Sequence, residues 1–229
     1  MFPLPFRDRG EAGCLLAEEL ASRKLPPNTI VLALPRGGVP IGLTVAKALH
    51  APLDVVVVRK LGVPWQPELA MGAIAGRSGR VLDERLIREL RISQEEVDAV
   101  ISRERMEAER REKLYRGDRP APDLRGRTVV LVDDGLATGS TMVVAARYVR
   151  SLKPSQLIIA VPIASVHACQ RVRTEADSCV CLATPEHFVA VGEWYSDFRQ
   201  VGDSEVQHLL EQASRRLELP EERELELRG

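Results

Sequence analysis

The hydrophobic positions of this chain fall into two patterns that alternate along its length. Short continuous apolar runs are typical of strands buried on both faces, whereas apolar residues recurring every three or four positions indicate helices with one buried side. Runs of the first kind predict strands at residues 30–34, 54–58, 128–132, 156–162 and 178–183. Stretches of the second kind predict helices at residues 11–20, 39–49, 85–90, 94–114, 142–152, 165–173 and 205–217.

Strands that alternate with helices favour an α/β fold, mainly a parallel sheet flanked by helices. We expect residues 1–183 to form the core, with a long loop and a helical insertion at 60–126. Residues 61–76 contain prolines and glycines without a sustained period, which predicts a long loop. Residues 184–229 would form a small hood segment and a last helix, and the charged end, 220–229, predicts a frayed tail.

The strand at 128–132 leads into the most informative run of the sequence. Asp133 and Asp134 close the strand, and Thr-Gly-Ser-Thr at 138–141 opens the next helix. Glycine and short hydroxyl side chains at a helix start suit a phosphate, because unpaired N–H groups and the positive end of the dipole meet there. The carboxylates would repel that phosphate, so sugar hydroxyls or a hydrated divalent metal would suit them. The run therefore indicates a site for a sugar phosphate. A strand, a turn and an ordinary helix N-cap that bind no ligand would give a similar sequence.

A second anion-type loop follows the strand at 30–34. Its residues, Pro35-Arg36-Gly37-Gly38, join a strand end to a helix start, where ligands gather in open α/β sheets. Paired glycines let backbone N–H groups approach an anion, and Arg36 adds a charged donor. The basic pair Arg59-Lys60 ends the next predicted strand and suits either the same anion or a solvated strand end.

The pattern Asp-Asp-x-x-Ala-Thr-Gly-x-Thr at 133–141 resembles the 5-phosphoribosyl-1-pyrophosphate (PRPP) motif of the type I phosphoribosyltransferases, closest to the adenine-specific branch. The resemblance implies a Rossmann-like core and a pentosyl-transferring enzyme that uses PRPP and Mg²⁺ and releases pyrophosphate. It implies catalytic roles for Asp133, Asp134 and Lys60, with the two aspartates holding Mg²⁺ directly or through water. The PRPP-binding residues that it implies are Arg36, Gly37, Gly38, Arg59, Ala137, Thr138, Gly139, Ser140 and Thr141.

The segment at 185–198 resembles loosely the hood of the 6-oxopurine phosphoribosyltransferases, in which an aromatic ring stacks on the base. Phe188 is then the stacking candidate and Trp194 and Tyr195 are reserves, although these rings could equally close a lobe over the core. His187 is expected at the surface. Ala137 stands where the 6-oxopurine enzymes carry a carboxylate. Ala137 therefore points to the adenine-specific branch, whereas the hood points to the 6-oxopurine branch. The acceptor, a nucleobase or a related small molecule, stays open.

Composition narrows the remaining functions. The formal net charge is −1 and 45% of residues are hydrophobic, as in an ordinary globular protein without a general basic surface for nucleic acid. The arginine-rich stretch 103–116 could supply a local basic face, but interleaved glutamates favour a salt-bridged helix. A regulatory protein that senses PRPP and binds nucleic acid or a protein partner is therefore the alternative to an enzyme.

The sequence also predicts the cellular location and the partners of the chain. No apolar run reaches the length of a membrane span or of a signal-peptide core. The four cysteines lack metal-site spacing, and Cys179 and Cys181 would share one face of a strand as small hydrophobes. We expect a reduced, cytoplasmic homodimer whose partners are PRPP and a small-molecule acceptor, with no membrane.

Overall fold

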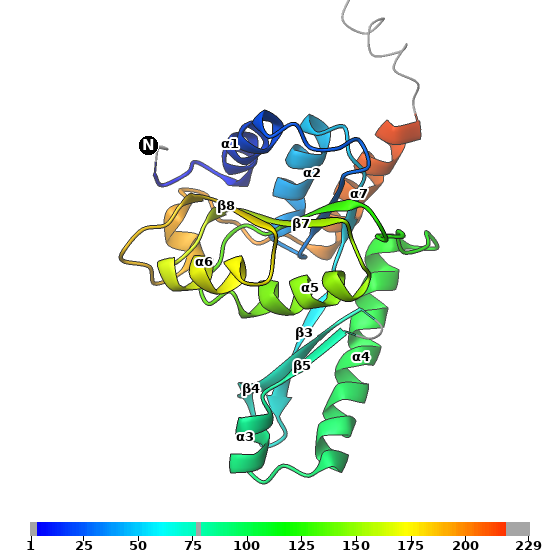
Figure 1. Cartoon of the computed structure of the whole chain (residues 1–229), viewed down its shortest axis with the longest axis vertical. Helices are drawn as coiled ribbons and strands as arrows, with labels where there is room; N and C mark the ends of the chain where they lie inside the picture. Colours follow the sequence, from blue (N-terminus) through cyan, green and yellow to red (C-terminus); the bar gives the residue numbers. More distant parts are fainter. Residues whose placement is uncertain (1–3, 77–78, 219–229) are drawn as a thin grey trace, which may run out of the picture.

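A central parallel sheet organises the fold, as a computed structural model shows (Figure 1). The structure describes residues 4–76 and 79–218. The sheet has five strands in the order β2-β1-β6-β7-β8, and every neighbouring pair is parallel. Its strands are β1 (Ile30–Ala33), β2 (Leu53–Val55), β6 (Thr128–Val132), β7 (Gln156–Ile163) and β8 (Ser178–Ala183). The predicted parallel α/β fold is confirmed.

Helices cover both faces of this sheet (Figure 1). One face carries α1 (Arg9–Ser22), α2 (Gly38–Ala48) and α7 (Asp203–Glu218), and the other carries α5 (Ser140–Ser151) and α6 (Val166–Arg173).

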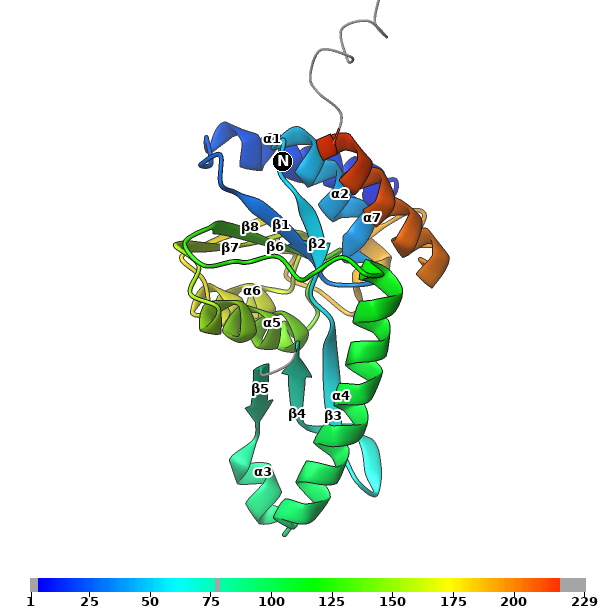
Figure 2. The ribbon, with the colours of Figure 1, turned by 90° about the vertical axis from the view of Figure 1, so that its right-hand side faces the viewer.

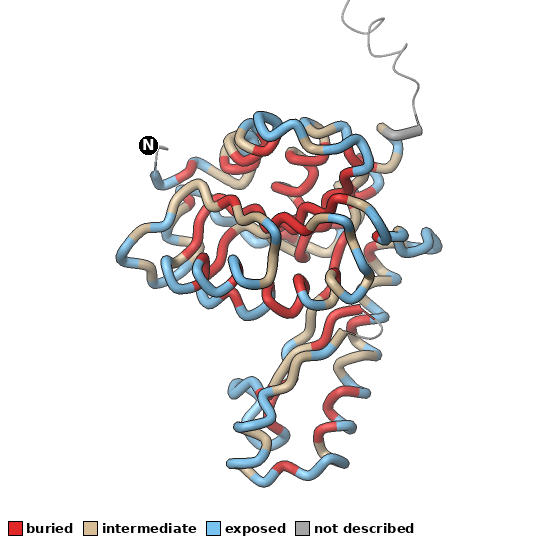
Figure 3. The backbone as a smooth tube through the Cα atoms, viewed as in Figure 1, coloured by how far each residue is buried: buried red, intermediate tan, exposed pale blue. Residues whose placement is uncertain are grey.

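Strand β6 shows why its apolar run is continuous. Val130 and Val132 belong to the core beneath α1 and α2, while Val129 and Leu131 belong to the core beneath α5. All four are fully buried, because successive side chains of a strand point to opposite faces. Burial is accordingly continuous through the sheet (Figure 3).

Residues 58–116 form an arm that projects away from the sheet (Figures 1 and 2). It is an antiparallel sheet in the order β3-β4-β5, followed by two helices. Strands β3 and β4 pack against α4, and the inner end of the arm contacts α5. The elements are β3 (Val58–Val63), β4 (Gln66–Ala75), β5 (Gly79–Leu82), α3 (Glu84–Glu89) and α4 (Gln94–Arg116).

The prediction of a long loop at 61–76 is wrong, because these residues form most of a β-hairpin. The register shifts on both sides of Gly62, and the outer half of β4 is exposed on both faces. A bulge and two-sided exposure remove the alternation by which a strand is recognised in sequence. The strand predicted at 54–58 is likewise divided, since β2 ends at Val55 and β3 begins at Val58.

Within the described ranges, every helix is too short or too polar to cross a membrane. The predicted frayed tail, residues 220–229, lies outside the described residues.

Candidate functional site

The two predicted anion-type loops lie against each other at the carboxyl ends of β1 and β6. The N–H of Leu34 donates to the carbonyl of Val132 over 2.9 Å and holds the strand ends together. A Cβ added to Gly38 would lie 2.8 Å from the same carbonyl oxygen, and one added to Gly37 would collide with the carboxylate of Asp134. A side chain at position 38 would therefore strike the backbone of the aspartate loop, and one at position 37 would push the Asp134 carboxylate aside.

The aspartate pair sits at this junction with an arginine that the sequence did not single out. Arg9, from the first turn of α1, donates from Nε and Nη2 to Oδ2 of Asp134 over 2.9 and 2.8 Å. The two side chains are only 11% and 14% exposed, so the pair is largely shielded from water. The N–H of Asp134 donates to Oδ1 of Asp133 over 2.9 Å.

Burial raises the pKa of both carboxyl groups. For Asp133, desolvation raises the pKa well above its ordinary value, and the neighbouring charge of Asp134 adds to the effect. For Asp134, desolvation also raises the pKa, and the guanidinium of Arg9 opposes it. Arg9 bonds only Asp134, and a cation bound beside the pair would lower the cost that burial places on both negative charges.

The hood segment is tied directly to the aspartates. The phenol of Tyr195 donates to the backbone carbonyl of Asp134 over 2.6 Å. Its ring lies 5.6 Å from that of Phe6 and 5.1 Å from that of Phe198, centroid to centroid. The guanidinium carbon of Arg9 lies 3.9 Å from the ring centroid of Phe198, a cation–π contact. The contacts of Tyr195 with Asp134, Phe6 and Phe198 are structural, so Tyr195 is a weak candidate for stacking on a base.

Phe188 and Trp194, the other stacking candidates, pack on each other. Their ring centroids are 6.1 Å apart with planes 27° from parallel, and both residues are half-buried. Trp194 ends the short 3-10 helix η1 (Val191–Trp194). His187 is exposed, as predicted. The role of Phe188 and Trp194 at a base stays a prediction.

The start of α5 has the form expected of a phosphate site. Gly139 occupies the N-cap position with φ +71°, a left-handed conformation that favours glycine, and it makes no side-chain cap hydrogen bond. Ser140 and Thr141 begin the helix and are exposed, as are Ala137 and Thr138. Backbone N–H groups at such a start attract an anion.

A second arginine that the sequence did not indicate borders this turn. Arg171 of α6 donates from Nη1 to Oγ of Ser140 over 2.9 Å and to the carbonyl of Thr138 over 3.4 Å. Nothing in the spacing of residues 165–173 indicates this contact, because it depends on how α6 packs beside α5.

Arg36 projects from its loop, residues 35–38, toward α4 and α7. Its Nη1 lies 3.9 Å from Oδ1 of Asp203, which also accepts a 2.6 Å hydrogen bond from the phenol of Tyr115. Burial, and then the bond to Asp203, raise the pKa of Tyr115 to about 12. The Arg36 side chain is 39% exposed, which leaves it accessible to an anion.

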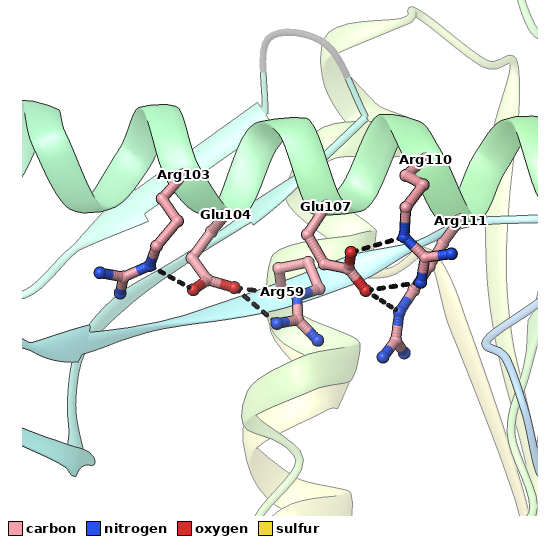
Figure 4. A network of polar contacts seen from close by, with 6 residues as sticks. All are labelled: Arg59, Arg103, Glu104, Glu107, Arg110 and Arg111. Atoms are coloured by element: carbon pink, nitrogen blue, oxygen red, sulfur yellow. Dashed lines mark hydrogen bonds and ion pairs between the residues drawn. The ribbon is translucent and has the colours of Figure 1, made fainter.

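Arg59 and Lys60 lie in β3, on the arm, and Figure 4 shows Arg59 beneath α4. Arg59 pairs with Glu104 of α4 at 2.6 Å, and Lys60 pairs with Glu68 at 3.3 Å. The structure therefore places both cations in contact with carboxylates of the arm rather than with the aspartate pair. Their contact with pyrophosphate stays a prediction.

The arginine-rich helix α4 is salt-bridged, as the interleaved glutamates predict. Glu107 accepts hydrogen bonds from Arg110 at 2.7 Å and from Arg111 at 2.8 Å (Figure 4). These bonds lower the pKa of Glu107 to about 2. Much of the positive charge of this helix is thus matched locally by its own glutamates.

The site offers hard oxygen ligands for a divalent cation. Mg²⁺ is usually held by one or two carboxylates together with phosphate oxygens and water, and Asp133 and Asp134 supply such carboxylates beside two anion-type loops. The donor set therefore fits Mg²⁺.

Comparison with known proteins identifies the family of this chain. The family model described as phosphoribosyl transferase domain matches residues 15–199. A crystal structure of TT1426 from Thermus thermophilus is 43% identical, covers 90% of this chain and 97% of its own, and superimposes with a TM-score of 0.78.

Two curated relatives from Mycobacterium tuberculosis are similar along most of this chain. They are named "Putative phosphoribosyl transferase Rv0571c" (strain ATCC 25618 / H37Rv) and "Putative phosphoribosyl transferase MT0597" (strain CDC 1551 / Oshkosh). Each is 46% identical over 210 residues, which is 92% of this chain but only 47% of the relative. The chain thus spans about half the length of these relatives. Since the family match covers most of the sequence and both motif loops, the chain belongs to the phosphoribosyl transferase domain family.

Proposed function

We propose that this protein transfers the phosphoribosyl group of PRPP to a nucleobase or a related small acceptor, with Mg²⁺ and with release of pyrophosphate. One observation carries the proposal: the glycine loop at 36–38 lies directly against the aspartate pair, which leads through a short turn into the Gly139 N-cap of α5. A sugar that carries a phosphate at one end and a pyrophosphate at the other needs two anion sites separated by hydroxyl acceptors. These loops offer that arrangement.

Each part of PRPP has a matching part of the site. The backbone N–H groups and hydroxyls of residues 137–141 would hold the 5′-phosphate, with Arg171 as an added cation. Asp133 and Asp134 would accept hydrogen bonds from the ribose hydroxyls. Arg36, Gly37 and Gly38 would hold the pyrophosphate through the guanidinium and backbone N–H groups.

Arg9 resolves an electrostatic conflict in this arrangement. Two carboxylates beside two phosphate groups would repel PRPP, but Arg9 offsets one of the negative charges at a distance of 2.8 Å. The same arginine fixes Asp134 in place, so its second oxygen is oriented before the substrate binds. Mg²⁺, held by Asp133 or Asp134 directly or through water, would neutralise charge on the leaving pyrophosphate.

The reaction replaces one bond at ribose C1. The bond from C1 to the pyrophosphate oxygen breaks, a bond from C1 to an acceptor nitrogen forms, and the proton of that nitrogen is released. The sugar passes through a state with oxocarbenium character, as in glycosyl transfer generally. The protein contributes by holding both ends of the sugar and by stabilising the departing charge.

The acceptor would enter beside the hood, where Phe188 and Trp194 form a stacked pair. A flat heterocycle suits such rings. Position 137 is alanine and has no carboxylate that could take a proton from the base. The acceptor nitrogen would therefore lose its proton without help from this residue.

The test is pyrophosphate release from PRPP and Mg²⁺ across purines, pyrimidines, orotate and simple amines. We expect release with at least one acceptor and loss of release when Asp133 and Asp134 are both changed to Asn. The exposed Asp118→Asn variant is the matched control and should keep full activity. PRPP binding by calorimetry without release for any acceptor would instead support the sensing alternative. Unchanged turnover in the double variant would overturn the roles given to the aspartates.

A further inference from the structure

Three of the four cysteines converge on one side of the sheet, between α6 and β8. Cys169 lies in α6 and is buried, while Cys179 and Cys181 lie in β8 and are half-buried. The Sγ atoms of Cys169 and Cys181 are 3.0 Å apart, and those of Cys179 and Cys181 are 3.6 Å apart. All three sulfurs lie within 4.8 Å of one another.

Regular structure fixes these positions. Cys179 and Cys181 are two residues apart on a strand and therefore point to the same face. They pair in register with Ile159 and Val161 of β7, which anchors the strand to the sheet. Helix α6 brings Cys169 over that face, and the Ser165 side chain caps the helix by accepting from the N–H of Ala168 at 3.0 Å. The three thiols are thus preorganised by two separately anchored elements.

The chemistry of the cluster is that of a soft-metal site. Sulfur ligands alone select thiophilic ions, whereas Mg²⁺ and Ca²⁺ require oxygen. A tetrahedral Zn²⁺ site has zinc–sulfur bonds of about 2.3 Å, which places its sulfurs roughly 3.8 Å apart. The sulfur of Cys181 lies 3.0 and 3.6 Å from the other two, slightly closer than this value, and all three sulfurs lie within 4.8 Å of one another, so small side-chain rotations would suffice. The half-exposure of Cys179 and Cys181 leaves access for a solvent molecule as fourth ligand.

We propose that Cys169, Cys179 and Cys181 form a three-thiolate binding site for a thiophilic metal ion, with Zn²⁺ as the ion that fits. The spacing of the cysteines in sequence does not indicate it, because the third ligand comes from a different element. A metal ion bound there would join α6 to the edge strand β8.

The experiment uses the full chain, reduced with a phosphine, stripped with a chelator and then equilibrated with Zn²⁺ and desalted. We expect elemental analysis to find about one equivalent of zinc per chain in the wild type. Cys169→Ser and Cys181→Ser should each lose most of it. Cys14→Ser is the matched control, since Cys14 is exposed in α1, outside the cluster, and should keep it.

A second measurement keeps the test decisive if a cysteine variant folds poorly. Co²⁺ added to the stripped wild-type protein should give the near-ultraviolet charge-transfer absorption of thiolate-bound cobalt, which Zn²⁺ then displaces. Failure of the reduced wild type to retain zinc or to give this absorption would overturn the proposal. So would an equal loss of zinc in Cys14→Ser.

Discussion

Arg9 and Asp134, 125 positions apart in sequence, form a largely buried ion pair in which two guanidinium nitrogens share one carboxylate oxygen at 2.9 and 2.8 Å. The pair joins the first helix to the end of the central strand. It also joins both to the hood, because Arg9 donates from Nη1 to the carbonyl of Arg199 over 2.8 Å and lies over Phe198. The contacts of this site lead to four predictions.

Replacing Arg9 by Gln should destabilise the protein by about 1.5–3 kcal/mol, because the Asp134 carboxylate loses its charged donors while still shielded from water. Urea denaturation at neutral pH measures the effect. Arg7→Gln is the control: Arg7 pairs with Asp8 at the surface with 73% of its side chain exposed, and its loss should cost far less stability than the loss of Arg9. Equal effects for the two variants would contradict a special role for Arg9.

Replacing Asp133 by Asn should stabilise the free protein at neutral pH while abolishing turnover. Burial raises the folded-state pKa of Asp133 above its ordinary value of 3.8, so folding penalises the charged form. The penalty is absent below about pH 3.8, where folded and unfolded chains are both protonated, and grows as pH rises toward the folded pKa. Denaturation at about pH 7 and about pH 3 should therefore show a gain for the variant at the higher pH alone. A loss of stability at pH 7 would contradict this account.

Replacing Gly37 by Ala should reduce pyrophosphate release by about 100-fold with little loss of secondary structure, because the new methyl group would displace the Asp134 carboxylate from its position. Circular dichroism and initial rates check the two halves of this prediction. Gly202→Ala is the matched control, since the nearest atom to its added methyl would be 3.8 Å away. Near-normal rates for Gly37→Ala would mean that the close approach of the two loops is not needed.

Replacing Arg171 by Gln should raise the KM for PRPP about tenfold and change kcat little, because Arg171 borders the proposed phosphate turn and would bind the sugar phosphate equally before and during reaction. Steady-state kinetics with varied PRPP measure both constants. Arg125→Gln, at an exposed position, is the control for loss of one positive charge. A fall in kcat with unchanged KM would place Arg171 in a different role.

The sequence predicts the parts of this molecule that depend on local pattern. The buried run at 128–132, the acidic pair after it and the helix start at 140 lie where expected, since burial on both faces leaves a continuous apolar signal. The Arg36 loop meets the aspartates because parallel strands bring their carboxyl ends to one edge of the sheet.

The parts that it missed depend on distant contacts. Arg9 approaches Asp134 only through the packing of α1, and no spacing in the first ten residues indicates it. The hairpin at 58–75 was missed because the irregular register around Gly62 interrupts the alternation of apolar and polar residues that indicates a strand. The cysteine cluster needs α6 folded over β8 before its third sulfur arrives.

The contacts of the amino-terminal segment with the hood have a dynamic consequence. Phe6 donates its N–H to the carbonyl of Trp194 over 2.9 Å and accepts from the N–H of Ser196 over 2.7 Å, while Tyr195 between them bonds Asp134. The amino-terminal segment and the hood thus share one set of hydrogen bonds and should open together as a single cooperative unit. Their amide protons should exchange with solvent at a common opening free energy. A ligand that holds Asp134 in place should slow exchange at Phe6 and at Ser196 by the same factor.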